Sequence, residues 1–190
     1  MIFVCREEND LYQVLQASGH AYPRRESLDT AIEEAQPGEG ILALADEYPR
    51  PSSAVTAAQL TAARAKKLRL FLEYPASLPD CPLGAPQPTQ WERAVIASNF
   101  FAPALRPGAI LALHGCWFLP APSVDAHLAA ARVAGYREAV YGLPEDAAPI
   151  LFPFGGEGVL VAATGLSRFV TGRYGPGSAW KAIWERILHW

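Results

Sequence analysis

Two glutamates each follow a short apolar run, a position in which carboxylates can act as acids and bases. Glu47 lies in ILALADEYP, residues 41–49, and Glu73 lies in LRLFLEYP, residues 68–75. If the runs form neighbouring strands, about 4.8 Å apart, the carboxyl groups could pair as in glycoside hydrolases. Those enzymes separate them by about 5 Å when retaining and about 6.5 to 9.5 Å when inverting. The alternative is structural, with each glutamate capping a helix N-terminus or pairing with Arg50.

The residues beside these glutamates are candidates for binding a ligand. Asp46 precedes Glu47, while Tyr48 and Tyr74 follow the two glutamates directly. The tyrosine rings could stack on sugar rings, although a buried tyrosine with one bonded hydroxyl is the more common arrangement.

Two arginines near the end of the chain form a second candidate site. Arg168 and Arg173 lie in SRFVTGRYGPGS, residues 167–178, whose glycines allow a ligand to approach the backbone closely. The segment precedes the last predicted helix, so it could bind an anion or a partner. The alternative is a turn whose arginines are solvated or ion-paired.

One cysteine stands where a nucleophile could lie. Cys116 follows an apolar run and is near His114, and a thiolate at a strand-to-helix turn beside a histidine would have a lowered pKa. The alternative is a thiol packed beside Trp117. Together with Cys5 and Cys81 the cysteines are odd in number and widely spaced, which favours reduced, buried thiols over disulfides or a metal site.

The elements that must position these residues follow from hydrophobic patterning. Apolar runs predict strands buried on both faces at residues 2–5, 41–45, 68–75 and 109–113. Residues 94–97 favour a strand, with a helix over 91–99 as the alternative. Helical signals cover residues 11–17, 30–35, 54–66 and 124–133, the last with Ser123 as its cap. This alternation predicts a mostly parallel sheet, in which ligands bind at the carboxyl ends of the strands.

The final third of the chain predicts a hairpin and a helix. Gly155 and Gly156 join two apolar runs, residues 148–152 and 158–163, as an antiparallel hairpin at one edge of the sheet. Helical spacing then links Trp180, Ile183, Trp184, Ile187 and Leu188. The pattern stops without a cap, which predicts that residues 1–190 are a single domain, the N-terminal part of a longer protein whose neighbouring domain is its partner.

Composition narrows the class of protein. The chain has 190 residues, of which 51% are hydrophobic and 18% charged, and its net charge is −3. These values predict one globular domain without a nucleic-acid partner. No apolar run approaches the roughly 20 residues that span a membrane and no signal peptide is apparent, so the default expectation is a cytoplasmic chain without a membrane partner. The 11% aromatic content would suit a homo-oligomer, and without a dinucleotide, P-loop or metal motif we expect no cofactor.

Several features together resemble the class I glutamine amidotransferase-like superfamily. They are the strand and helix alternation, the acidic residue after an early strand, the Gly-Cys turn after a late one, and the ending GGEGVLVAATGLSRFVTGRYGPGSAWKAIWERIL. The closest similarity is to non-catalytic domains of bacterial carbohydrate-active proteins, of the ThuA-like and β-galactosidase trimerisation types. The resemblance implies a flavodoxin-like, three-layer α/β/α sandwich, with a carbohydrate partner and an accessory or assembly role in glycoside degradation.

The sequence departs from the catalytic members of that superfamily. Those carry a Gly-x-Cys-x-Gly nucleophile elbow and a late His-x-Glu pair, whereas this chain reads HGCWF at residues 114–118 and has no later His-x-Glu. The departure implies a non-catalytic domain. The alternative is a small hydrolase that uses Glu47 with Glu73 as paired carboxylates, or Cys116 with His114 as nucleophile and base.

Overall fold

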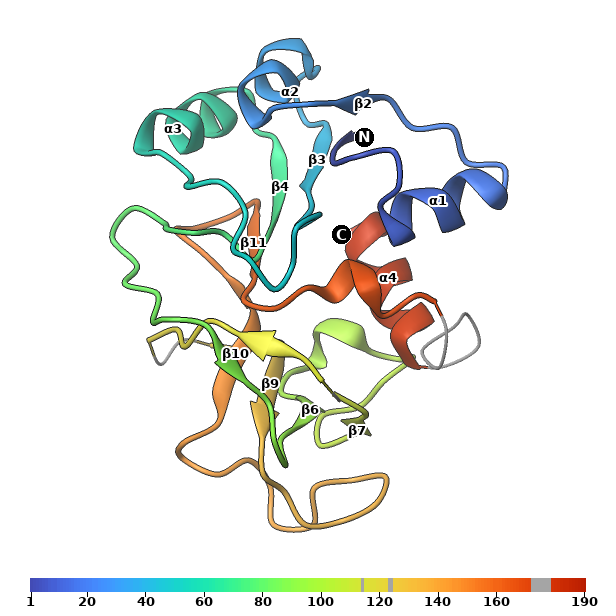
Figure 1. Cartoon of the computed structure of the whole chain (residues 1–190), viewed down its shortest axis with the longest axis vertical. Helices are drawn as coiled ribbons and strands as arrows, with labels where there is room; N and C mark the ends of the chain where they lie inside the picture. The colour runs from blue at the N-terminus through green and yellow to red at the C-terminus, as the bar shows by residue number, and fades with distance from the viewer. Residues whose placement is uncertain (114, 123–124, 172–178) are drawn as a thin grey trace.

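The protein is built on a mixed nine-stranded sheet (Figure 1) with the order β2-β1-β3-β4-β11-β10-β9-β6-β7. The computed structural model describes residues 1–113, 115–122, 125–171 and 179–190. Its first five strands are mutually parallel: β2 (Arg24–Arg25), β1 (Ile2–Val4), β3 (Gly40–Ala43), β4 (Arg69–Glu73) and β11 (Val159–Ala162). The other four alternate in direction: β10 (Ala148–Pro153), β9 (Leu128–Ala131), β6 (Arg93–Ile96) and β7 (Ile110–Leu111). Of the nine strands of this sheet, β10 and β6 alone oppose the rest, so the sheet is mostly parallel, as expected.

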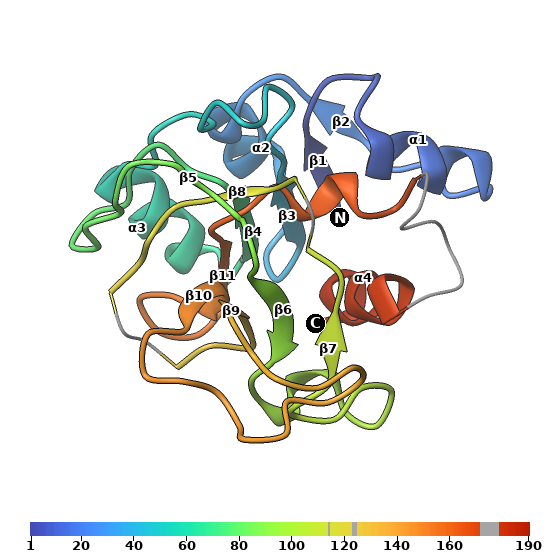
Figure 2. The same cartoon turned by 60° about the horizontal axis from the view of Figure 1, so that its bottom comes forward.

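Helices cover both faces of the parallel half and make three layers (Figure 2). The helices are α1 (Asp10–Ala17), α2 (Leu28–Glu34), α3 (Ala57–Ala65) and α4 (Ala179–His189). Apolar residues of α1 and α4 share one core with the sheet, and those of α2 and α3 share another on the opposite face. This arrangement confirms the flavodoxin-like α/β fold.

The C-terminal helix α4 packs as its spacing predicts. Trp180, Ile183, Trp184 and Ile187 are all buried. The Trp184 ring meets the Phe71 ring edge-on at a centroid distance of 5.4 Å. Its indole N–H donates to a backbone oxygen, so both the apolar body and the polar edge of the ring have partners.

The predicted hairpin is present, but it occupies the middle of the sheet. β10 and β11 pair antiparallel, with Leu151 opposite Ala162. β9, β6 and β7 extend the sheet beyond β10. The hairpin therefore joins the parallel and antiparallel halves instead of forming an edge.

One predicted element has the wrong type. The helix expected over residues 124–133 is strand β9 where the structure describes it, Leu128–Ala131, and all four residues of the strand are buried. Alanine favours helix intrinsically, yet here the small side chains fit between β10 and β6, and tertiary packing prevails. Its expected cap, Ser123, lies outside the described residues, and the strand predicted at residues 94–97 is confirmed as β6.

Two short elements complete the part next to the site. β5 (Gln87–Pro88) and β8 (Trp117–Phe118) form a separate antiparallel pair. The single-turn helices η1 (Asn99–Phe101) and η2 (Leu166–Arg168) follow β6 and β11. None of the described helices is long and apolar enough to cross a membrane.

Candidate functional site

The sheet order creates a crevice between the carboxyl ends of β1 and β3. From β1 the chain crosses through α1 on one face to β2, and from β3 it crosses through α3 on the other face to β4. The loops therefore leave these two neighbouring strands in opposite directions. In open α/β sheets with this order, ligands bind at that switch point.

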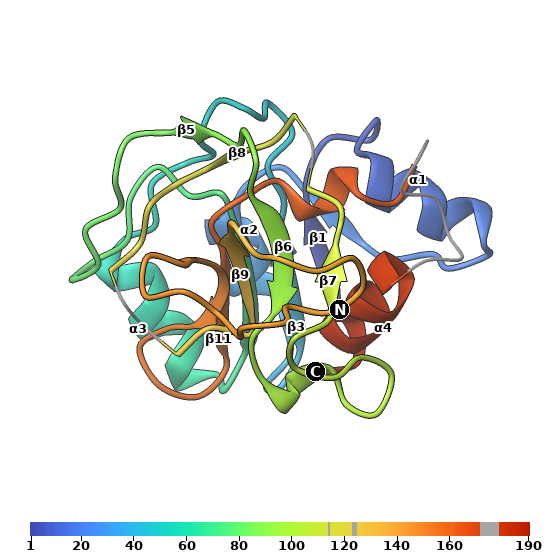
Figure 3. The same ribbon diagram turned by 90° about the horizontal axis from the view of Figure 1, so that it is seen from below.

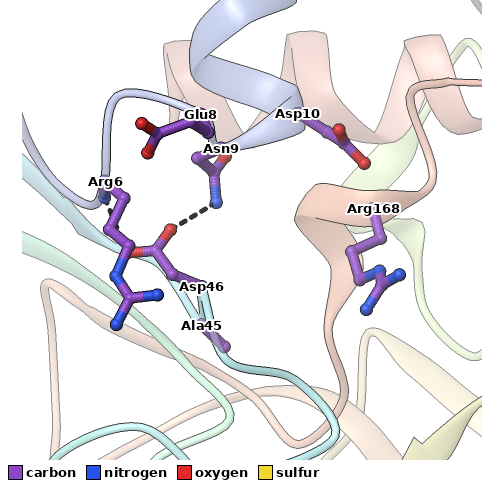
Figure 4. A pocket seen from close by; sticks show the side chains of 7 residues that line it. All are labelled: Arg6, Glu8, Asn9, Asp10, Ala45, Asp46 and Arg168. Carbon is purple, nitrogen blue, oxygen red and sulfur yellow. Dashed lines mark hydrogen bonds between the residues drawn. The ribbon is translucent and has the colours of Figure 1, made fainter.

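Two cavities open at the switch point, and they share Arg6 and Asp46. The first has a volume of about 430 Å³ and is also lined by Glu8, Asn9, Asp10, Ala45 and Arg168 (Figure 4). The second has a volume of about 630 Å³ and includes Arg24, Glu26, Glu47 and Ser52 in its lining. Asp46, one of the predicted ligand-binding residues, thus lies at the centre of the crevice.

Asp46 is held in place by the loop that follows β1. One carboxylate oxygen accepts the backbone N–H of Arg6 at 2.6 Å, and the other accepts the Asn9 side-chain amide at 2.9 Å. The Asn9 oxygen in turn accepts N–H groups of the first turn of α1, as an N-cap does. Figure 4 shows Asp46 facing Asn9 across this contact, so the position of the carboxylate is fixed from both sides.

The charges around the crevice are mixed and mostly compensated. Glu47 is ion-paired with Arg6 and, at 3.2 Å, with Arg50. The hydrogen bond from Arg6 is the main reason why the pKa of Glu47 is lowered. Arg168 donates to the backbone oxygen of Tyr48 at 3.0 Å and lies 5.6 Å from the centroid of that ring.

Glu73 is a buried structural carboxylate. It is 1% exposed and accepts three hydrogen bonds: from Ala45 N–H at 2.7 Å, from Ser167 N–H at 2.5 Å and from the Ser167 hydroxyl at 2.8 Å. Burial raises the pKa of Glu73 to about 7, against the opposing effect of these hydrogen bonds. The carboxylate therefore links the ends of β3, β4 and β11.

The two predicted catalytic glutamates do not form a pair in one open pocket. Glu47 is exposed and lines the 630 Å³ cavity, whereas Glu73 lines a different cavity of about 170 Å³ and has its oxygens bonded to backbone and serine donors. Glu47 pairs with Arg50, and Glu73 accepts from the first turn of η2. These are the kinds of contact that the structural alternative describes.

The turn after β4 places a tyrosine in a strained backbone conformation. Tyr74 has φ of 48°, in the left-handed region that non-glycine residues rarely adopt. In α/β enzymes a nucleophile is exposed on a strained turn between a strand and a helix, whereas the next element after Tyr74 is the short strand β5. Here the Tyr74 side chain is 0% exposed and packs in the core, edge-on to Tyr48 at 5.0 Å between centroids.

Cys116 does not occupy a nucleophile's position. It immediately precedes β8, an extended segment and not a strand-to-helix turn, and is 4% exposed. Burial raises the pKa of its thiol to about 12, so the thiolate form is disfavoured. The proposed base His114 and the candidate Arg173 lie outside the described residues.

Tyr48 is engaged in structure too. Its hydroxyl donates to the backbone oxygen of Trp117 at 2.7 Å and accepts the backbone N–H of the same residue. It also lies 3.3 Å from the Thr164 hydroxyl. Tyr48 therefore ties the loop after β3 to β8 and to the end of β11.

Sequence reasoning missed the contribution of the loop after β1. Arg6, Asn9 and Asp10 supply one wall of the crevice (Figure 4). The signal was present, because the run of polar residues directly follows the first predicted strand. In the described part of the chain, no cluster of three or more histidine, cysteine or acidic side chains could hold a metal ion.

Comparison with known proteins supports the fold. No protein family model matches the sequence, and no curated protein matches it. A chain in the solved structure of PurLQS from Thermotoga maritima is similar, with a TM-score of 0.58 and 15% sequence identity, over 99% of this chain and 96% of that chain. The chain therefore has a class I glutamine amidotransferase-like fold. At this level of identity the likeness extends to the fold alone.

Proposed function

We propose that this chain is a non-catalytic, amidotransferase-like accessory domain that binds a small polar ligand in the switch-point crevice. The observation that carries the proposal is that the strained residue directly after β4 is Tyr74, whose side chain is fully buried. The neighbouring Glu73 is committed to structural hydrogen bonds. Neither side chain is available to attack a substrate.

The lining of the crevice favours a neutral polyhydroxyl ligand over an anion. The 430 Å³ cavity carries two guanidinium groups, from Arg6 and Arg168, and three carboxylates, from Glu8, Asp10 and Asp46. Such a lining offers donors and acceptors side by side without a net positive charge. A sugar, with hydroxyls that donate and accept, matches this pattern, and a carbohydrate-related role agrees with the resemblance set out in the sequence analysis.

Calorimetric titration with mono- and oligosaccharides tests the proposal, with inorganic phosphate as the anionic comparison. We expect a saccharide to bind and phosphate not to bind. Arg168→Gln should weaken saccharide binding at least tenfold. Arg106→Gln is the matched control, because its side chain is 76% exposed, pairs with Glu138 and lines neither crevice cavity.

Assays with glutamine and with aryl glycosides complete the test. We expect no turnover above the buffer rate. Hydrolysis that disappears in Glu73→Gln or Cys116→Ser would overturn the non-catalytic assignment and support the small hydrolase. Binding of phosphate alone would overturn the choice of ligand.

A further inference from the structure

Of the exposed large apolar side chains among the described residues, all except Trp117 on β8 lie on or next to one segment. The segment between β9 and β10, residues 132–147, is called the aromatic loop here, and it lies at the end of the molecule away from α2 and α3 (Figure 1). Its exposed members are Tyr136 at 87%, Val140 at 65%, Tyr141 at 89% and Leu143 at 39%. Trp91, 78% exposed, is next to Glu92, whose carboxylate binds Arg132 at the start of the loop.

The aromatic loop is firmly attached to the sheet. The backbone N–H of Val140 donates to Ala134 across the loop at 3.0 Å. The backbone N–H of Ile110, in the edge strand β7, donates to the backbone oxygen of Arg137 at 3.0 Å. The Arg93 guanidinium donates to the backbone oxygen of Gly135 at 2.7 Å. Since the backbone is pinned in this way, the exposed tyrosines belong to an ordered surface. A preorganised surface loses little entropy on binding.

The loop also replaces a helix as the cover of the antiparallel half of the sheet. On that side the core consists of buried Val95, Ala131 and Ala139, with no residue from a described helix. Figure 3 shows the loop crossing this end of the sheet near β6, β7 and β9. The cover is thin and its outer side is apolar, which is typical of a surface that is buried by a partner.

We infer that the aromatic loop is the contact surface between two copies of this chain. The charges beside the patch favour a second copy over a different partner. Arg137, Glu145 and Asp146 are exposed and make no ion pair among the described residues. Across a two-fold axis the same surface of both copies forms the contact, so the Arg137 of each copy can face the Glu145 and Asp146 of the other.

The expected contact is weak because the patch is small. Stable dimers bury about 800 Å² per partner, and five large side chains supply only part of that area. Sedimentation equilibrium should therefore be run over about 1 to 500 µM. We expect a reversible monomer–dimer equilibrium that shifts at least tenfold toward monomer in the double variant Tyr136→Ser, Tyr141→Ser.

Charge reversal gives the sharper test. Arg137→Glu should weaken self-association at least tenfold, and so should the double variant Glu145→Arg, Asp146→Arg. A mixture of these two variants should recover a heterodimer, because every cross-contact then joins opposite charges. Lys67→Glu is the matched control, since Lys67 is exposed, lies outside the loop and should leave the equilibrium unchanged.

Two results would overturn the inference. One is a wild-type chain that stays monomeric at every concentration, which would leave the loop to a different partner. The other is a dimer that neither the tyrosine changes nor the charge reversals affect. Circular dichroism of each variant confirms folding, and the inference does not depend on the crevice being a ligand site.

Discussion

Ser167 donates two hydrogen bonds to the carboxylate of Glu73, one from its backbone N–H at 2.5 Å and one from its hydroxyl at 2.8 Å. The third hydrogen bond to Glu73 comes from the backbone N–H of Ala45. In the chain, Ala45 directly precedes Asp46 and Ser167 directly precedes Arg168. Asp46 and Arg168 line opposite sides of the 430 Å³ cavity (Figure 4). One buried carboxylate therefore sets the relative position of two walls of the crevice.

Replacement of that carboxylate by an amide should be costly. In Glu73→Gln the amide nitrogen cannot accept a backbone N–H, so one of the two N–H donors loses its acceptor. Urea unfolding should show a loss of about 2 to 3 kcal/mol. Ser167→Ala should cost about 1 kcal/mol, because the N–H contact survives, and exposed Glu47→Gln should change stability by less than either. Equal losses for Glu73→Gln and Glu47→Gln would contradict the structural role of Glu73.

The same group makes stability depend on pH. Burial raises the pKa of Glu73 from 4.5 to about 7, so between these values the folded state holds a proton that the unfolded state has released. The contribution of Glu73 to the free energy of unfolding should therefore fall as pH rises from about 4.5 to 7 and stay level above that. The penalty of Glu73→Gln relative to wild type should shrink over this window. Unfolding curves from pH 4.5 to 8 for both chains measure it, and a penalty that grows with pH would reverse the assignment.

Two tyrosines in contact should respond oppositely to loss of the hydroxyl. Tyr74 Oη is the buried polar side-chain atom without a hydrogen-bond partner among the described residues, whereas Tyr48 Oη bonds to Trp117. Tyr74→Phe should raise the free energy of unfolding by about 1 kcal/mol, and Tyr48→Phe should lower it by about 1 to 2 kcal/mol. Thermal unfolding of the two variants in the same buffer distinguishes them. A destabilised Tyr74→Phe would mean that its hydroxyl has a partner.

The cysteines should be inert in the folded protein. Cys5, Cys81 and Cys116 are buried, and burial raises the pKa of each thiol, to about 12 for Cys5 and Cys116. A disulfide reagent at pH 8 should modify fewer than one thiol per native chain in minutes and all three in 8 M urea. Fast labelling of the native chain that is lost in Cys116→Ser would reopen the nucleophile hypothesis.

Local patterns were sufficient for most of the fold. Short apolar runs predicted β3, β4 and β6, and the spacing of Trp180 and Ile183 predicted α4. The hydrophobic pattern was insufficient for β9, where the intrinsic preference of the residues and their packing environment favour different secondary structures. The alanines of β9 favour a helix in isolation, and only the neighbouring strands β10 and β6 make them a strand.

The site was harder to predict because its contacts join distant segments. Glu73 and Ser167 are 94 residues apart in the chain, so no local signal shows that the carboxylate is engaged. The same holds for the Tyr48 hydroxyl and Trp117, which are 69 residues apart. The carboxyl ends of the strands were located correctly, whereas the state of each side chain there depends on those long-range partners.

The place of β11 in the sheet has a consequence for how the chain acquires its structure. It is the last strand along the described residues, yet it lies between β4 and β10. During synthesis on the ribosome, the parallel and antiparallel halves must each wait with an open edge until residues 159–162 emerge. Pairings over such long sequence separations form slowly. A nascent chain shortened before Val159 should therefore engage chaperones, and one that extends beyond Ala162 should be the first able to close the sheet.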